Sequence, residues 1–124
     1  MADMEIRLVE GRANAHFKGL TLQTGGEGNP SAFDLFIASL GACAALTAAG
    51  YCRSRNIDSE GLQILVDVER NPDTRLASKI KMEIVLPEGF PAEHRDRLVK
   101  AANACFVKKH LYEQPEFETT VREA

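Results

Sequence analysis

The chain has 124 residues, enough for one domain built around one hydrophobic core. Hydrophobic residues make up 44% of it and charged residues 27%, which is the balance of an ordinary soluble globular protein. The net charge of −3 and the lack of a basic cluster argue against nucleic-acid binding. The N-terminus shows no basic start followed by an apolar stretch, and the odd number of cysteines argues against a disulfide scaffold. We therefore expect a single domain over residues 1–124 in the reducing cytoplasm.

The first part of the chain predicts three short strands, over residues 4–11, 12–19 and 20–24. In the second strand small or aromatic residues alternate with polar ones, which is typical of a strand with one buried face: Ala13, Ala15 and Phe17. Gly11 and Gly19 stand where the turns are expected. The segment GGEGNPS (25–31) is rich in turn-forming residues and predicts a loop.

A long helix is predicted next, from the N-cap residue Ser31 to about Arg55. From Leu35 to Gly50 it carries no charge on any face, and such a helix lies either in a buried core or in a membrane. These sixteen residues, interrupted by polar and small ones, are too short for a membrane span, which needs about 20 mostly apolar residues. One subunit of this size offers too little sheet to cover the helix on all sides. We therefore expect a homodimer whose second helix packs against the run of glycine and alanine.

The second half of the chain predicts a hairpin, a helix and a strand. Apolar residues alternate with polar ones from Leu62 to Glu69 and from Lys79 to Leu86, which indicates a hairpin with one dry face. Pro91 is a good first residue for a second helix, expected to reach about Tyr112. The alternation of apolar and β-branched residues at the end predicts a last strand: Phe117, Thr119 and Val121. The expected order is βββ-α-ββ-α-β, an α+β fold.

The three cysteines carry the most chemical information. Cys43 and Cys52 would lie roughly 13 Å apart along one helix and face opposite ways, whereas a disulfide needs Cα atoms within about 7 Å. No C-x-x-C or H-x-x-x-H spacing supports a zinc site. We interpret Cys52 as a packing residue. Helical stripes that contain Cys43 and Cys105 can bring their sulfurs together, but free cysteines are most often small buried hydrophobes. The residues alone leave both interpretations open.

A family resemblance favours chemistry. The segment GNPSAFDLFIASLGAC (28–43) resembles the signature of the OsmC/Ohr family, and ANACFVKKHL (102–111) resembles that family's second-cysteine helix. The predicted order of elements is also the family's. The resemblance implies an intertwined α+β homodimer with two long central helices, and thiol-dependent reduction of organic hydroperoxides. It implies that Cys43 is the attacking cysteine and Cys105 the resolving one.

The resemblance also assigns roles to other residues. A cysteine in the middle of an apolar helix has a raised pKa, so a thiolate there requires a nearby cation. The family uses an arginine from the N-terminal strands, held by a carboxylate near the start of the first helix. Arg12 best matches that arginine, with Arg7 as runner-up, and Asp34 matches the carboxylate. Asp34 has an alternative role as a first-turn acid that the helix dipole favours. The expected contacts to a bulky organic peroxide are Phe33, Phe36 and Leu40.

The implied cycle forms a sulfenic acid on Cys43 and then a Cys43–Cys105 disulfide, which an external dithiol of the lipoyl type or a small thiol reduces. No metal, flavin or haem is needed, and no membrane or nucleic acid is involved. The chain departs from the family by Phe33 in place of the Ohr glutamate and by Phe106 in place of a frequent proline. His110 is a candidate proton donor. The alternative is a non-peroxidase dimer that binds a small apolar ligand or acts as a thiol sensor.

Overall fold

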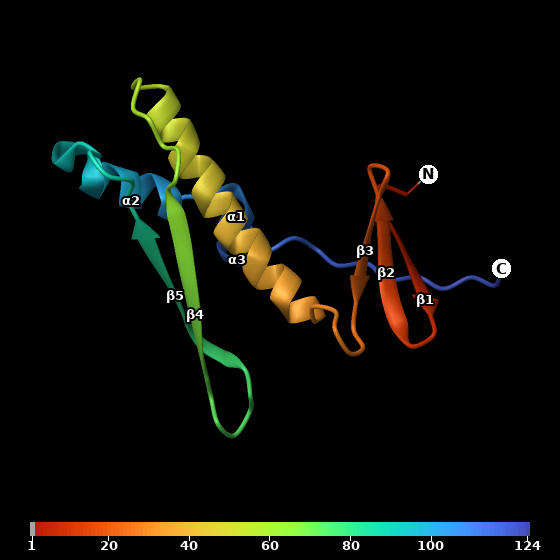
Figure 1. Cartoon of the computed structure of the whole chain (residues 1–124). Helices are drawn as coiled ribbons and strands as arrows, with labels where there is room; N and C mark the ends of the chain where they lie inside the picture. The colour runs from red at the N-terminus through yellow and green to blue at the C-terminus, as the bar shows by residue number, and fades with distance from the viewer. Residues whose placement is uncertain (1) are drawn as a thin grey trace. The chain divides into compact units, whose positions relative to one another are not determined.

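A computed structural model describes residues 2–124 (Figure 1). The elements follow one another as three strands, one long helix, a β-hairpin, a 3-10 turn and two short helices. This is the α+β class that the sequence predicts. The chain divides into two compact units, Met1–Ser39 and Leu40–Ala124. Helix α1 (Ala32–Arg53) begins in the first unit and ends in the second.

The first unit contains an antiparallel sheet in the order β1-β2-β3. Its strands are β1 (Glu5–Val9), β2 (Arg12–Phe17) and β3 (Leu20–Thr24). The two connections are two-residue turns, Glu10–Gly11 and Lys18–Gly19, and both residues of each turn have positive φ. That combination defines the type I′ turn, whose twist suits a hairpin and whose second position favours glycine. The two glycines therefore fix the strand register, as the sequence predicts.

One face of this sheet is apolar and largely exposed in the single chain. The strand register places these apolar side chains on the same face: Ile6, Leu8, Ala13, Ala15, Phe17, Leu20 and Leu22. Leu8 is 81% exposed, and Ile6 and Leu20 are each 58% exposed. A contiguous apolar face of this kind is typical of a surface that another element or another chain covers.

The second unit is built on the hairpin of β4 (Gln63–Arg70) and β5 (Ala77–Val85). Burial alternates along both strands, so one face is dry, as the sequence predicts. Helix α1 lies on this dry face, because a Cβ atom added at Gly41 would stand 3.5 Å from a methyl group of Val66. A small residue at position 41 therefore permits the close approach of helix and sheet.

The core of this unit lies near the end of α1. It consists of Ala48, Cys52, Phe90 and Leu98, packed against half-buried neighbours that include Tyr51 and Ile84. Cys52 is completely buried, and this burial raises the pKa of its thiol, although the charge of Arg55 acts in the opposite direction. These features fit the packing role that we expect for Cys52.

Two predictions about the C-terminal part are wrong. The single helix expected from Pro91 to Tyr112 is divided into the 3-10 turn η1 (Ala92–His94), helix α2 (Arg95–Asn103) and helix α3 (Phe106–Tyr112). The strand expected at 117–121 is absent, since residues 113–124 form neither helix nor strand. Phe117 and Val121 are 88% and 98% exposed. A strand needs a hydrogen-bonded neighbour, and the alternating pattern alone does not supply one.

Helix α1 is less buried in the single chain than its sequence leads us to expect. Leu46 is 72% exposed, and only 17% of the most apolar 18-residue window of α1 is buried. By length and composition this helix is able to cross a membrane, but core helices of soluble proteins pass the same test. The single chain thus leaves two apolar surfaces uncovered. One is the face of the β1–β3 sheet, and the other is the exposed side of α1.

The buried position of Leu98 predicts that shortening its side chain lowers the stability of the protein. Leu98 is 1% exposed, so Leu98→Ala should lower the free energy of unfolding by about 2–5 kcal/mol through lost burial and an unfilled cavity. The neighbouring Val99 is 48% exposed, and Val99→Ala should cost much less. Denaturant unfolding followed by circular dichroism measures both values. Equal losses for the two variants would contradict the assignment of the core.

Candidate redox site

The structure brings the Cys43 and Cys105 side chains together. Cys43 lies in the middle of α1 and is half-buried, and Cys105 precedes α3 and is 2% exposed. The two thiols are free and joined by a side-chain hydrogen bond. The contact joins residues that are distant in sequence, as pairing between a nucleophile and a resolving thiol requires.

The break between α2 and α3 shapes this contact. Cys105 has an extended backbone, with φ −67° and ψ 150°, and caps the start of α3. The backbone N–H of Val107 then donates a hydrogen bond to the Cys43 sulfur at 3.5 Å. The break therefore serves both thiols: it directs the Cys105 side chain, and it aims a backbone donor at Cys43.

The surroundings favour the thiolate of Cys43. Burial raises the pKa of this thiol, but hydrogen bonds from the Val107 N–H, the Cys105 thiol, the Thr47 hydroxyl and the Phe106 N–H together lower the pKa below its ordinary value. The Thr47 hydroxyl also lies 2.7 Å from the Cys43 carbonyl oxygen, within hydrogen-bond distance. Backbone and side-chain donors from this unit thus supply part of the stabilisation that the sequence leads us to expect from a cation.

Cys105 has the opposite tendency. Burial raises the pKa of its thiol, and the hydrogen bond to Cys43 raises it further, while the N–H and the charge of Lys108 compensate only in part. The pair therefore consists of Cys43, whose pKa is lowered, and a neighbour, Cys105, whose pKa is raised. This is the order of ionisation that a nucleophile and its resolving partner need.

A small apolar pocket lies on the same elements. Its volume is about 160 Å³, and its lining residues are Leu40, Ile80, Met82, Asn103, Lys108 and Leu111. Leu40, which the sequence predicts to contact substrate, is one turn before Cys43 on α1. A second hollow of about 180 Å³ shares Met82 and Asn103 with the first and includes Ala44. A cavity of about 150 Å³ holds a benzene ring, so each hollow has room for a group of about six carbon atoms.

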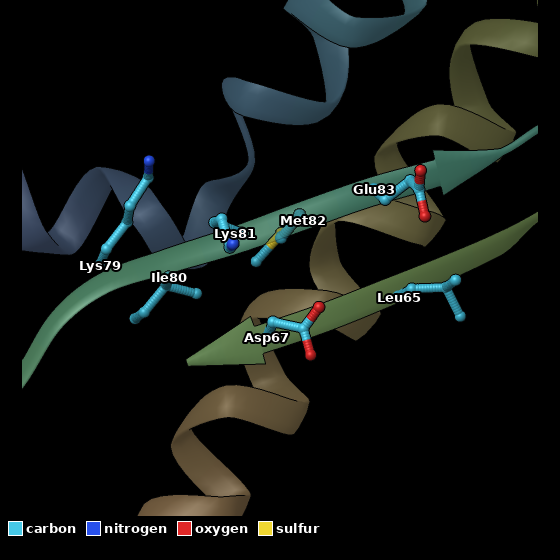
Figure 2. A pocket seen from close by; sticks show the side chains of 7 residues that line it. All are labelled: Leu65, Asp67, Lys79, Ile80, Lys81, Met82 and Glu83. Atoms are coloured by element: carbon cyan, nitrogen blue, oxygen red, sulfur yellow. The ribbon is translucent and has the colours of Figure 1, made fainter. Parts of the chain in front are cut away.

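A larger hollow lies elsewhere. It has a volume of about 620 Å³ on the β4–β5 hairpin, where Figure 2 shows the charged side chains of both strands around it: Asp67, Lys79, Lys81 and Glu83. Neither thiol lines it. Neither thiol lines the two smaller hollows, but these include Leu40 and Ala44 of α1, which lie within one turn of Cys43.

Arg12 and Asp34 both lie in the first unit, but no ion pair within 4 Å joins them in residues 2–124. The Arg12 side chain is exposed and runs past Gly26, where an added Cβ atom would stand 3.5 Å from it. Arg7, the runner-up, pairs with Glu5. The roles of both arginines at a thiolate stay predictions.

Asp34 has a visible structural role. Its carboxylate accepts a hydrogen bond from the Ser31 N–H at 2.9 Å, and its own N–H donates to the Ser31 hydroxyl oxygen at 3.0 Å. This reciprocal pair is a capping box, which satisfies free donors at the start of α1. The alternative that the sequence leaves open, a first-turn acid, is therefore present, and the carboxylate's role beside an arginine stays a prediction.

The remaining candidates are aromatic. The rings of Phe33 and Phe36 lie near each other, with centroids 5.6 Å apart, and both side chains are half-buried. Their contact with substrate stays a prediction. His110 is exposed, and its ring stacks edge-on against Phe106 at 4.9 Å. Within residues 2–124, no group of three or more His, Cys, Asp or Glu side chains is arranged to hold a metal ion.

The lowered pKa of Cys43 depends on its donors and predicts a pH effect. Cys105→Ala removes one donor and should raise the pKa of Cys43, so alkylation of Cys43 by iodoacetamide should begin at higher pH. Cys105→Ser keeps a hydroxyl donor and should leave the profile close to that of the native chain. Mass spectrometry of the Cys43 peptide over a pH series gives the measurement. An unchanged profile in the alanine variant would contradict the thiol–thiol hydrogen bond.

The capping box predicts that Asp34 stabilises α1 as a hydrogen-bond acceptor and not through its charge. Asp34→Ala removes the acceptor for the Ser31 N–H and should destabilise the protein by about 0.5–2 kcal/mol. Asp34→Asn keeps an oxygen acceptor while losing the charge, so it should retain most of the stability. Thermal unfolding of both variants tests this, and equal destabilisation would show that charge and not capping is what α1 requires.

Comparison with known proteins identifies the family. A model of the family described as OsmC-like protein matches residues 25–120. No curated protein matches the chain in sequence. A structure of a candidate osmotic stress induced and detoxification response protein from Psychrobacter arcticus 273-4 superimposes with a TM-score of 0.77 at 21% identity, covering 88% of this chain and 87% of that one.

Two further structures agree in fold. An OsmC-like protein from Mycoplasma pneumoniae has a TM-score of 0.75 at 14% identity and covers 90% of this chain and 87% of its own. A hypothetical protein from Aquifex aeolicus VF5 has a TM-score of 0.78 at 14% identity, with 92% and 89% covered. At these identities the structures share the fold alone, whereas the family model covers most of the sequence. The chain belongs to the OsmC-like protein family.

Proposed function

We propose that this protein is a cysteine peroxidase that reduces organic hydroperoxides to alcohols. One observation carries the proposal. Cys43, whose pKa is lowered, lies in hydrogen-bond contact with Cys105, a buried thiol whose pKa is raised. A nucleophile that ionises easily beside a protonated resolving thiol is the arrangement that a two-cysteine peroxidase needs.

The cycle has two oxidative steps. The Cys43 thiolate attacks the distal peroxide oxygen, the O–O bond breaks, and the leaving alkoxide takes a proton to become an alcohol. Cys43 is then a sulfenic acid. The sulfur of Cys105 attacks it, water leaves, and a Cys43–Cys105 disulfide forms. An external dithiol, of the lipoyl type or a small thiol, returns the pair to the reduced state.

The donors around Cys43 support the first step. The Val107 and Phe106 N–H groups stabilise the thiolate before it reacts. Arg12, held by Asp34, would add a positive charge for the thiolate and the leaving alkoxide, with Arg7 as the other candidate. The organic group would contact Leu40, which lines the small apolar pocket, together with Phe33 and Phe36.

The working form is proposed to be a cytoplasmic homodimer of one 124-residue domain per chain. The exposed apolar face of the β1–β3 sheet and the exposed side of α1 support this, because a single chain leaves both in water.

A second function is supported by the two small hollows that α1 lines with Leu40 and Ala44. Two small hollows with mainly apolar linings are also what a dimer that binds a small apolar ligand would offer, with the thiols as packing residues or as a sensor. The two functions differ in turnover, because only the peroxidase consumes hydroperoxide catalytically.

Turnover of cumene hydroperoxide with dithiothreitol tests the proposal. Cys43→Ser should lower the rate by about 100-fold or more, since the nucleophile is lost. Cys105→Ser should slow the cycle and lead to progressive inactivation of Cys43, because the sulfenic acid stays open to further oxidation. Cys52→Ser is the matched control and should keep the native rate, apart from any loss of stability. Full turnover by Cys43→Ser, or none by the native protein, would reject the peroxidase in favour of the ligand-binding dimer.

A further inference from the structure

The two sulfurs of the redox pair differ in access. The Cys105 side chain is 2% exposed, whereas Cys43 is half-buried. The inference here rests on the proposed function, since it concerns the Cys43–Cys105 disulfide. A dithiol from solution reaches the more accessible sulfur first, so access favours attack on Cys43.

Attack on Cys43 has a chemical cost. Thiol–disulfide exchange expels the sulfur that is not attacked as a thiolate, and a thiol of lower pKa leaves faster. The leaving sulfur would be that of Cys105, whose pKa is raised by burial. Access and leaving-group ability therefore favour opposite sulfurs, and the reaction through Cys43 requires a group that stabilises the buried thiolate of Cys105.

Lys108 occupies the required position. It lies three residues after Cys105 in the first turn of α3, is half-buried, and lines the small apolar pocket with Leu40 and Asn103. Its ammonium group donates a hydrogen bond to a neutral oxygen, Oδ1 of Asn103, at 3.4 Å. No carboxylate in residues 2–124 lies within 4 Å of it. A half-buried cation without an acidic partner is available to a new anion.

The same lysine already acts on the thiol. Its backbone N–H and, to a smaller extent, its charge lower the pKa of Cys105, although burial outweighs them. The next residue, Lys109, differs in this respect. It is exposed and lines a separate hollow with Tyr112 and Glu113. The chain thus offers two adjacent lysines on one helix, of which one is beside the thiol pair.

We propose that an external dithiol attacks the Cys43 sulfur of the disulfide and that Lys108 stabilises the Cys105 thiolate that leaves. In the first step a dithiol sulfur bonds to Cys43 as the Cys43–Cys105 bond breaks, and the electron pair remains on Cys105, which then takes a proton. In the second step the second thiolate of the reductant attacks the reductant's first sulfur, which is bonded to Cys43 in the mixed disulfide. Cys43 leaves as a thiolate, and the dithiol becomes a cyclic disulfide.

Reduction kinetics test the role of Lys108 without peroxide. The disulfide is formed with diamide and reduced with dithiothreitol, a neutral dithiol, so recognition of a charged reductant plays no part. The logarithm of the exchange rate changes by about 0.5 for each pKa unit of the thiol. Each unit by which the pKa of Cys105 rises therefore slows the step about threefold. Lys108→Met should therefore be slower by up to about threefold, Lys108→Arg should recover most of the rate, and Lys109→Met should match the native protein.

A pH profile separates charge stabilisation from structural damage. In a background of Cys43→Ser and Cys52→Ser, Lys108→Met should move the alkylation profile of Cys105 to higher pH, and Lys109→Met should not. Equal rates and equal profiles for the two lysine variants would overturn the role of Lys108.

The site of attack is read on the native protein, which needs no variant. The disulfide form is exposed briefly to 2-mercaptoethanol, quenched with acid and mapped by mass spectrometry. The adduct should lie on Cys43 with Cys105 free, and an adduct on Cys105 would overturn the proposed direction of attack. If diamide fails to link the two cysteines at all, the proposed function fails as well, whereas a normal disulfide with unaltered reduction rejects only the present inference.

Discussion

The contact between Cys43 and Cys105 depends on one backbone irregularity. If the second helix continued without a break, the residues after Cys105 would bond their N–H groups within that helix. The extended backbone at Cys105 interrupts this pattern, and the N–H of Val107 reaches the Cys43 sulfur. One interruption therefore produces the contact between the thiols, the lowered pKa of Cys43 and the placement of Lys108 beside Cys105.

Burial raises the pKa of both cysteines, but hydrogen-bond donors outweigh this effect only at Cys43. At Cys43, donors more than compensate for burial, so the thiolate forms at lower pH than in an ordinary cysteine. At Cys105 burial dominates, which protects its proton in the reduced state but makes it a poor leaving group in the oxidised state. A site that gains an easily ionised nucleophile thus acquires a difficulty in its reductive step. Lys108 is the charge in the described part of this unit that is placed to reduce that difficulty.

The apolar surfaces of the single chain set a second constraint. The sheet face that contains Leu8 and Ile6, and the side of α1 that contains Leu46, are exposed to an extent that the hydrophobic effect disfavours. The small residues of α1 allow close packing, as the approach of β4 at Gly41 shows. A second copy of the chain is the partner that we propose for these surfaces.

Much of the fold could be predicted from local patterns. Alternating residues identified both sheets, and Gly11 and Gly19 marked the turns because type I′ geometry requires positive φ. The break before Phe106 could not be predicted, since the segment AANACFV contains neither glycine nor proline and the causes are tertiary. The last strand was predicted wrongly because alternation does not reveal whether a neighbouring strand exists. Asp34 was ambiguous, as one carboxylate can cap a helix and also hold an arginine.

The site was predictable only in part for the same reason. A family signature identified Cys43 and Cys105, but the donors of Val107 and Phe106 are backbone groups, which any residue carries. No side-chain pattern reports them. The expected need for a cation came from considering Cys43 on its own helix, without the elements that pack against it. Lys108 was visible in the sequence only as part of a short basic run.

The central claim is that Cys43 is the nucleophile and Cys105 its resolving partner. Peptide mapping by mass spectrometry tests it most directly, after one equivalent of cumene hydroperoxide is added to the reduced protein. Our account predicts rapid, stoichiometric formation of a Cys43–Cys105 disulfide, and a trapped sulfenic acid on Cys43 when Cys105 is replaced by serine. Survival of all three thiols, or slow oxidation of Cys52 alone, would contradict it.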